Sequence, residues 1–260
     1  MISQFRDIYR YREAVRNMVA RDLKVRYSNS VLGVVWSLFS PLLMTLVYYV
    51  VFTFLVPSGI QNFPVYLMAG LMPWTFFATS LVGTTLAVSS NGALINRVYF
   101  PREVLPLASL LSNGVNFLIS LVLLFVVIAL FRIPLSVSLV CLPVIVLIQT
   151  IFSFGMGLLL AALNVYFRDT QQLVDVSVLA WFFVTPIIYS IDVIHNASLK
   201  LLVEIVNPMA GLIIAYRHVL YSGDWPEAGL LAISALEAVA ILAIGAYVFR
   251  RLSPAFAEEV

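Results

Sequence analysis

The sequence predicts an all-α, polytopic membrane protein: a single transmembrane domain, residues 1–260, with six membrane-spanning helices. Hydrophobic residues make up 62% of the chain and charged residues only 11%, and the mean hydropathy is +1.01. A soluble domain is closer to half apolar and a quarter charged. Because the charged residues are too few to cover a globular surface, lipid is the expected solvent for most of the chain.

The segment before the first apolar run, residues 1–30, is expected to form an amphipathic helix in the headgroup layer. Apolar residues recur in it at helical spacing, while most of its arginines face the other way. The apolar stripe comprises Ile8, Tyr11, Val15, Met18, Val19 and Leu23. Two roles stay open for this helix: a topology anchor on anionic lipid, and a contact with a partner protein.

Six apolar runs are long enough to cross a bilayer, for which a helix needs about 20 mostly apolar residues. The expected spans are residues 31–56, 65–88, 105–131, 135–163, 173–189 and 228–249. The first run is too long for the core of a signal peptide, so it is expected to be a permanent span. The fifth span is the shortest of the set.

A further apolar stretch lies between the fifth and sixth spans, but polar and helix-breaking residues interrupt it. Glu204, the Asn207-Pro208 pair and Arg217 all fall within it. We therefore expect two short external helices within residues 195–222 that meet at Asn207-Pro208 and dip into the membrane from one side.

The basic residues are unevenly divided between the two sides of this topology. Of the 15 lysines and arginines, twelve lie before the first span, in the loops after spans two and four, or after span six. The other side carries only Arg132, Lys200 and Arg217. Because basic residues accumulate in cytoplasmic loops, both termini are predicted to lie in the cytoplasm.

The loop between spans two and three, residues 91–104, combines apolar and charged residues. Asn91-Gly92 is a turn signal, and Pro101 favours the end of a helix before it. One face of the short helix expected here carries Leu94, Ile95, Val98 and Tyr99. Charged residues beside it are Arg97, Arg102 and Glu103. An apolar knob with a charged rim suits a docking site for another protein, although an ordinary interfacial turn fits the same residues.

Spans one and five carry aromatic residues at three- and four-residue spacing. Aromatic faces can stack on sugar rings while Thr and Tyr hydroxyls bond to sugar hydroxyls, so such faces suit a glycan pathway. The alternative is that the rings pack helices together or face lipid. The residues concerned are Thr45, Tyr48 and Phe52 in span one and Trp181, Phe182, Thr185 and Tyr189 in span five.

Polar side chains within the spans are sparse. Glu237 lies near the middle of span six, where a carboxylate is costly and serves either a function or a hydrogen-bonded lock between helices. Interhelical hydrogen bonds are expected from Asn113, Asn116 and Gln149. A face of close helix packing is expected at Ser153, Gly157 and Ala161.

Several chemistries have no support in the sequence. It contains no G-x-x-x-x-G-K-[ST] phosphate loop, so no ATPase site and no bound cofactor are expected in this chain. Cys141 is the only cysteine, and His195 and His218 are isolated, so no metal site is expected either.

Three stretches carry a family resemblance. The first is residues 21–27 (RDLKVRY), followed by Leu32-Gly33, Trp36 and Pro41-Leu42. The second is residues 94–101 (LINRVYFP), with Glu103 and Pro106. The third is residues 164–169 (NVYFRD), followed by residues 186–189 (PIIY) and 207–209 (NPM). In these stretches, spread over nearly the whole chain, the sequence resembles the permease subunits of bacterial polysaccharide ABC transporters of the ABC-2 class.

The resemblance implies a half-transporter in the bacterial inner membrane. Two copies of the permease pair, and each binds a separate ATPase subunit that holds ATP and Mg²⁺. The implied cargo is a lipid-linked polysaccharide, with O-antigen favoured over capsule and wall teichoic acid. Membrane lipid is the remaining expected contact, and no nucleic acid is expected.

The resemblance also implies roles for particular residues. The loop helix from Leu94 to Phe100 would couple to the ATPase subunit, the loop after span four would make a second contact, and residues 195–222 would form external gate helices. The implied coupling residues are Leu94, Asn96, Arg97, Tyr99, Phe100, Pro101, Arg102, Glu103, Arg168 and Asp169. Spans one and five would line the translocation pathway, with Trp36, Thr45, Tyr48, Phe52, Trp181, Phe182, Thr185 and Tyr189.

Two functions of other classes stay open on the residues alone. A membrane enzyme that acts on lipid-linked sugars needs a carboxylate or metal site near one membrane face, and Asp169 and Asp175 are the nearest candidates. A secondary carrier would use Glu237.

Overall fold

The computed structural model describes residues 11–27, 35–55, 59–96 and 100–259, and every regular element in these ranges is helical. The longer helices are α2 (Arg12–Tyr27), α3 (Val35–Val50), α4 (Phe63–Leu86), α6 (Val104–Leu130), α7 (Leu142–Tyr166), α8 (Thr170–Val184), α9 (Ala197–Val206), α10 (Pro208–Arg217) and α11 (Ala228–Leu252). The shortest are α5 (Gly92–Ile95) and α12 (Phe256–Glu259). A π-helical turn, Val51–Leu55, extends α3, and another, His218–Ser222, extends α10.

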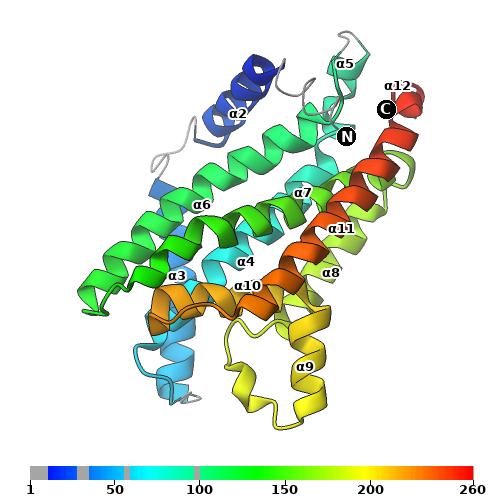
Figure 1. Ribbon diagram of the computed structural model, residues 1–260. Helices are drawn as coiled ribbons and strands as arrows, with labels where there is room; N and C mark the ends of the chain where they lie inside the picture. The colour runs from blue at the N-terminus through cyan, green and yellow to red at the C-terminus, as the bar shows by residue number, and fades with distance from the viewer. Residues whose placement is uncertain (1–10, 28–34, 56–58, 97–99, 260) are drawn as a thin grey trace.

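Helix α4 runs through the middle of the bundle (Figure 1). Of its most apolar 18 residues, 78% are buried inside the protein, against 17% for the corresponding stretch of α11 at the rim. Its two prolines fit this position. Pro64 lies in the first turn, where no backbone donor is needed. Pro73 lies inside the helix, and its carbonyl accepts a 2.7 Å hydrogen bond from Gln149 Nε2 on α7. Gln149 thus makes the kind of interhelical bond that the sequence predicts.

Helices α7 and α11 pack with their backbones in contact. A Cβ atom on Gly245 of α11 would overlap the carbonyl oxygen of Gly155 on α7. On the neighbouring face of α7, a Cβ atom on Gly157 would meet the side chain of Thr84 on α4. Ala161, one turn further along, is fully buried. Small residues on α7 therefore let it pack closely between α4 and α11.

Four helical stretches are long and apolar enough to span a membrane: Phe63–Leu86, Val104–Leu130, Val137–Tyr166 and Ala228–Ala255. They lie where four of the six expected spans were placed, and the chain is therefore a multi-pass membrane protein. The helices α9 and α10, which meet at Asn207 with a bend of 97°, amount to a fifth span if they are counted together. The six-span topology is not confirmed among the described residues.

The first and fifth expected spans differ most from the structure. The fifth, expected at residues 173–189, is the 15-residue helix α8, which ends at Val184. It ends there because Pro186 disfavours helical geometry at Thr185, whose φ and ψ are −91° and 134°. The first, expected at residues 31–56, is described only from Val35 to Leu55.

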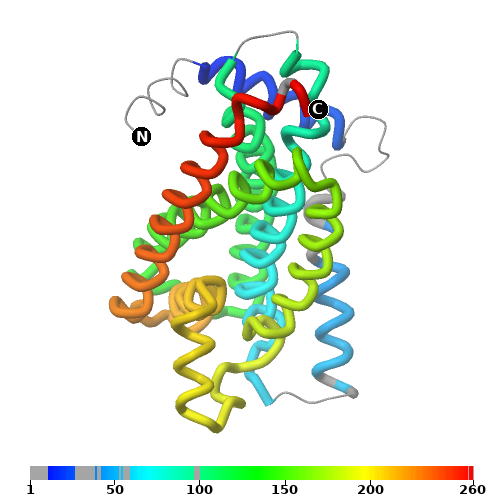
Figure 2. Tube along the Cα trace, turned by 90° about the vertical axis from the view of Figure 1, so that its right-hand side faces the viewer, coloured from blue at the N-terminus to red at the C-terminus, as the bar shows by residue number. Residues whose placement is uncertain are grey.

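The two ends of the bundle carry different elements (Figures 1 and 2). Helices α2, α5 and α12 lie at one end, where both the first and the last described helices are found. Helices α9 and α10 lie at the opposite end. Helix α2 is amphipathic as expected: Val15 is buried, whereas Arg12, Arg16 and Arg21 are exposed. The remainder of the expected helix, residues 1–10 and 28–30, lies outside the described residues.

Candidate functional site

The first candidate site is the end of the bundle that carries α2, α5 and α12. Helix α5 has four residues and ends at Ile95, so the described helix is shorter than the one expected from Leu94 to Phe100. Ile95 is buried, Leu94 is half-buried and Asn96 is exposed. Arg97 and Tyr99 lie outside the described residues. Phe100 stands just before Pro101, in a position where proline disfavours helix, and is not helical.

A small apolar core, which we call the terminal core, holds this end together. It joins the end of α4, helix α5, the start of α6 and the ends of α7 and α11 to α12. Its buried members are Ala87, Val88, Ile95, Leu105, Leu158, Ala161, Ala162, Val165, Phe249 and Phe256, and Leu94 and Phe100 pack against it. The loop after α4 and the loop after α7 thus rest on one common core.

Phe256 in α12 is the centre of the aromatic contacts in the terminal core. It is fully buried, and its ring lies edge-on to Phe249, with centroids 5.3 Å apart, and 6.2 Å from the ring of Tyr166. The guanidinium of Arg102 lies 5.8 Å from the Phe256 ring centroid. Tyr166 in turn donates a 3.0 Å hydrogen bond to the carbonyl of Leu252. The C-terminal residues therefore contact Arg102 from the first loop and Tyr166, which precedes the second.

The second loop presents charged residues beside the first. Arg168 and Asp169 are both exposed between α7 and α8. A cavity of about 280 Å³ opens here, between Arg168, Gln171 and Glu259. Asn164 lies at its wall, is 4% exposed, and donates a 3.1 Å hydrogen bond to Ser89 Oγ of the first loop. Its Oδ1 atom has no hydrogen-bond partner among the described residues. Arg102 and Glu103 are half-exposed on the first loop, so four of the charged residues predicted to couple to a partner, Arg102, Glu103, Arg168 and Asp169, share one end of the bundle.

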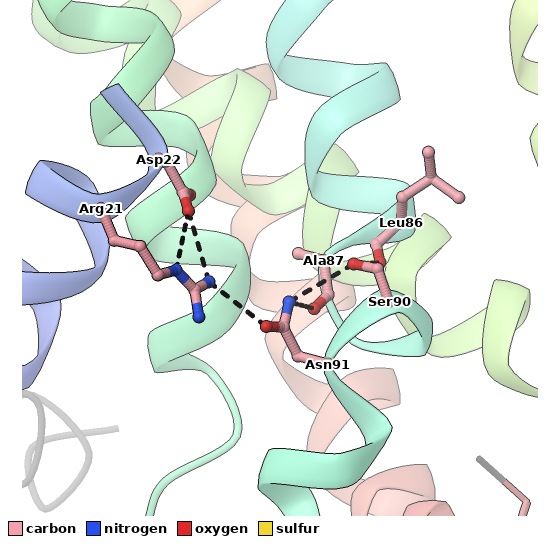
Figure 3. A network of polar contacts seen from close by, with 6 residues as sticks. All are labelled: Arg21, Asp22, Leu86, Ala87, Ser90 and Asn91. Atoms are coloured by element: carbon pink, nitrogen blue, oxygen red, sulfur yellow. Dashed lines mark hydrogen bonds and ion pairs between the residues drawn. The ribbon is translucent and has the colours of Figure 1, made fainter. Parts of the chain in front are cut away.

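Helix α2 is tied to the first loop by a polar network (Figure 3). The Arg21 guanidinium donates to Asp22 Oδ1 at 3.3 and 3.4 Å and to Asn91 Oδ1 at 3.3 Å. Asn91 Nδ2 donates to the carbonyl of Ala87 at the end of α4, at 2.9 Å. Arg26, one turn further along α2, bonds to Asn113 of α6.

The second candidate site is a run of aromatic rings between α3, α8 and α4. Tyr48 of α3 stacks on Phe182 of α8 with centroids 6.5 Å apart, and Phe182 meets Trp74 of α4 at 5.8 Å. Phe52 lies 6.5 Å from Tyr48 and 5.5 Å from Phe63. The structure therefore brings together Tyr48, Phe52 and Phe182 of the predicted pathway. Thr45 is buried, and the side chain of Trp36 lies outside the described residues.

Two other pathway candidates, Trp181 and Thr185, bond to Asn207 at the break between α9 and α10. Trp181 Nε1 donates to Asn207 Oδ1 at 2.8 Å, and Asn207 Nδ2 donates to Thr185 Oγ1 at 3.0 Å. Thr185 Oγ1 donates to the Trp181 carbonyl at 2.8 Å. Asn207 Oδ1 also accepts from the Ala210 amide at 3.3 Å and so caps α10. The polar groups of these two candidates thus already have partners within the chain.

Arg217 is a functional candidate that its sequence context did not reveal, because there it interrupts an apolar stretch and adds one external positive charge. It is 6% exposed, and its two Nη atoms donate to the carbonyls of Pro186 and Ile187, both at 2.6 Å. Its guanidinium lies 3.7 Å from the ring centroid of Tyr66, whose hydroxyl donates to the Tyr189 carbonyl at 3.0 Å. Arg217 thereby joins α10 to the segment after α8. The sequence feature that could have indicated this role is a single arginine within an apolar stretch.

The segment that leads into α9 carries an ion pair. Lys200 Nζ lies 2.7 Å from Asp192 Oδ1, and Ser190 Oγ donates to Asp192 Oδ2 at 2.9 Å. These two hydrogen bonds lower the pKa of the Asp192 carboxyl. Asp192 is largely open to water and Lys200 is about one third exposed, so the pair contributes little to stability.

The residues behind the alternative functions are dispersed. Asp169 and Asp175 are exposed, and Glu237 is half-buried with its Oε2 atom unpartnered among the described residues. No group of three or more His, Cys, Asp or Glu side chains suited to a metal ion occurs in the part of the chain that the structure describes.

Comparison with known proteins gives consistent matches. The family model described as ABC-2 type transporter matches residues 13–221. The O-antigen export system permease protein RfbA of Myxococcus xanthus is 36% identical over 260 residues, which is 100% of both chains. A protein of the same description from Klebsiella pneumoniae is 32% identical over 239 residues, covering 92% of this chain and 91% of its own.

Proposed function

This chain belongs to the ABC-2 type transporter family, and we propose that it is the permease subunit of an ATP-driven exporter of lipid-linked O-antigen. The relatives from Myxococcus and Klebsiella, described as O-antigen export permeases, support this cargo over capsule or teichoic acid. The proposed location is the bacterial inner membrane with both termini in the cytoplasm, as the distribution of basic residues favours.

The terminal core is the observation that carries the proposal of an ATPase partner. It supports both loops at one end of the bundle and presents exposed Asn96, Arg168 and Asp169 beside half-exposed Arg102 and Glu103. A docking surface of this kind needs a rigid base with accessible polar and aromatic groups. We assign the contact to Leu94, Asn96, Phe100, Pro101, Arg102, Glu103, Arg168 and Asp169, with Arg97 and Tyr99 in the segment between them.

In this proposal ATP and Mg²⁺ are held by the partner subunit, and this chain converts the partner's movement into movement of its helices. Because both loops rest on the ends of α4, α6, α7 and α11, a push on the loops acts directly on the membrane-spanning helices. Two copies of the chain would form the channel, and the half-exposed rings of Tyr48 and Phe52, backed by the buried Phe182, would offer sugar-stacking faces.

Co-purification tests the docking surface. The tagged chain is isolated from native membranes as wild type, as the double variant Phe100→Ala/Arg168→Glu, and as the control Arg132→Glu, which reverses an exposed charge at the end of α6 away from the terminal core. Loss of a central contact typically costs about 2 kcal/mol or more, so we expect at least about a tenfold loss of ATPase subunit in the double variant. Retention of the subunit by the double variant would contradict this surface.

Transport in proteoliposomes tests the cargo and the reaction. The chain and its ATPase subunit are reconstituted with labelled lipid-linked O-antigen, and movement across the bilayer is followed with and without ATP. Strictly ATP-dependent movement is expected. Chemical change of the lipid-linked sugar without ATP, abolished by Asp169→Asn, would instead establish the membrane-enzyme function.

A further inference from the structure

A polar cavity of about 570 Å³ lies between α2 and the adjoining ends of α4 and α6. Three charged residues of α2 face it, Arg21, Asp22 and Arg26, together with Ser90 and Asn91 of the loop after α4 and Ser109 of α6. Figure 3 shows the side of this cavity formed by Arg21, Asp22 and Asn91. None of the proposed contacts with an ATPase subunit or a glycan uses this cavity.

Arg26 is fixed in the cavity by a neutral partner. Both of its Nη atoms lie 3.1 Å from Asn113 Oδ1. Asn113 is 3% exposed and is itself held by its Nδ2 atom, which donates to the carbonyls of Ser109 at 3.1 Å and Thr79 at 3.3 Å. The guanidinium is therefore positioned in advance and, since Arg26 is exposed, accessible to a ligand. Its amide partner supplies no counter-charge.

The cavity carries an excess of positive charge. Arg21 shares its guanidinium between Asp22 and Asn91. Among the lining residues that the structure describes, two guanidiniums thus face one carboxylate, which leaves a net charge of +1. Arginine binds phosphate oxygens through paired N–H donors, so an anion with phosphate geometry suits this arrangement.

The position of the cavity beside two apolar membrane-spanning helices, and its partly apolar wall, indicate a lipid rather than a free anion. It lies between α2 and the ends of the two candidate membrane spans, α4 and α6. Helix α2 runs across this end of the bundle (Figure 2). Met18, Leu105 and Ala108 form part of the same lining. A ligand that contacts both the basic and the apolar residues of this lining has an anionic head and an apolar body.

We propose that this cavity binds the phosphate of an anionic lipid from the adjoining membrane leaflet and so fastens α2 to α4 and α6. The same chemistry has two sources, a bilayer phospholipid and a polyprenyl diphosphate that carries a glycan. Only the second depends on the proposed function. Gly83 lies at the floor, where a Cβ atom would come within 2.8 Å of Ser109 Oγ and 3.2 Å of Asn113 Nδ2, so a larger residue there disturbs the support of Arg26.

Native mass spectrometry of the detergent-purified exporter complex tests the site. The probes are phosphatidylglycerol, phosphatidylcholine, a short-chain polyprenyl diphosphate and inorganic phosphate, and no ATP is added. Because hydrogen bonds to charged groups contribute about 1.5–3 kcal/mol, Arg26→Gln is expected to weaken phosphatidylglycerol binding about tenfold or more. Arg16→Gln is the matched control: it removes the same charge from an exposed position of α2 outside the cavity, and its affinity is expected to stay within about twofold of wild type.

The comparison among probes identifies the source of the phosphate. Stronger binding of polyprenyl diphosphate than of phosphatidylglycerol assigns the cavity to the glycan carrier, and the reverse assigns it to the bilayer. Equal binding of phosphatidylglycerol and phosphatidylcholine, or equal losses in Arg26→Gln and Arg16→Gln, would overturn the proposal. None of these readouts requires transport, so they are independent of the export function.

Photolabelling of the wild-type complex gives a second measurement that does not depend on how a variant folds. A phosphatidylglycerol with a photoreactive headgroup is expected to label peptides from α2 and from the first turns of α6. Labelling confined to other segments would contradict the assignment of the cavity.

Discussion

Arg217 is a charged side chain that the fold has buried and surrounded with acceptors. Burying an unpaired charge is expensive, but the carbonyls of Pro186 and Ile187 follow the end of α8 and have lost their helical partners, so each gains a donor from this guanidinium. The Tyr66 ring covers its face. At the scale of the residue, the Arg217 guanidinium thus provides hydrogen-bond donors for the carbonyls that follow α8, and it holds α10 against that segment.

Replacing Arg217 by Gln should lower the free energy of unfolding by about 2–4 kcal/mol, because it strips donors from two carbonyls in the protein interior. The control is Lys200→Gln, which removes an equal charge from the exposed pair with Asp192 and should cost less than about 1 kcal/mol. Thermal melting in detergent measures both. Equal decreases in melting temperature for the two variants would show that Arg217 stabilises the fold no more than a surface charge does.

Asn207 offers a test in which its side-chain hydrogen bonds are removed either all together or in part. Asn207→Ala removes the Trp181 bond, the Thr185 bond and the cap on α10 together, and should cost about 2–3 kcal/mol. Asn207→Asp keeps an acceptor for Trp181 and for the cap but cannot donate to Thr185, so its cost should be smaller. Tryptophan fluorescence during thermal melting ranks the two. Equal costs would mean that the bond to Thr185 dominates, because both variants lose it. A larger cost for Asn207→Asp would mean that burying its carboxylate outweighs the bonds it keeps.

At the scale of elements, the contact between α7 and α11 is determined by glycines. Gly245→Ala places a methyl group against the Gly155 carbonyl, and the helices must separate to accept it. We expect a loss of about 1–3 kcal/mol. Gly229→Ala, on the same α11, is the matched control because nothing lies within 4 Å of its added Cβ atom, and it should be neutral or stabilising by up to about 1 kcal/mol. Melting temperatures compare the two directly, and a tolerated Gly245→Ala would show that the helices separate freely.

The helices whose positions follow from nearby residues could be predicted from the sequence. Long apolar runs placed α4, α6, α7 and α11, and Asn207-Pro208, a break visible in the sequence, is where α9 and α10 meet. The early end of α8 was also a local effect, since Pro186 stood inside the expected span and should have shortened it.

The partners of polar and aromatic residues were much less predictable, because they depend on which helices meet. Trp181 and Thr185 fit a pathway by spacing alone, yet their hydrogen bonds go to Asn207, which lies more than twenty residues away in the chain. The complete burial of Phe256 could not be predicted, because the segment around it is too short to show an apolar pattern. Sequence periodicity indicates which face a residue occupies on its helix but does not identify the residue opposite.

At the scale of the whole molecule, the two ends of the bundle are linked through helices that belong to both. Tyr66 of α4 contacts Arg217 at one end, and Ala87, which follows the last residue of α4, belongs to the terminal core at the other. Helix α11 packs along α7 and ends in the terminal core at Phe249. Because packed helices move as rigid bodies, we expect a displacement at the terminal core to reach the outer break between α9 and α10.

Phe256 is the residue through which this linkage can be tested. Phe256→Ala should open a cavity among Phe249, Tyr166 and Arg102, and burial of this kind is worth about 3–5 kcal/mol. Because the cavity lies under both loops, we expect the ATPase subunit to be retained less well and the remaining complex to hydrolyse ATP with less transport per turnover. Phe131→Ala, which truncates a partly exposed ring just after α6, is the control and should change neither quantity.

Three readouts on the same preparation separate the local effect from general unfolding. Co-purified ATPase subunit reports docking, transport per ATP hydrolysed reports coupling, and tryptophan fluorescence reports the bundle near Trp74 and Trp181, which lies outside the terminal core. Reduced docking and coupling with unchanged fluorescence is the expected pattern, because the substitution lies in a separate apolar cluster from those tryptophans. Full docking and normal coupling in Phe256→Ala would show that the two loops hold their positions without the Phe256 ring, and would contradict a linkage that passes through it.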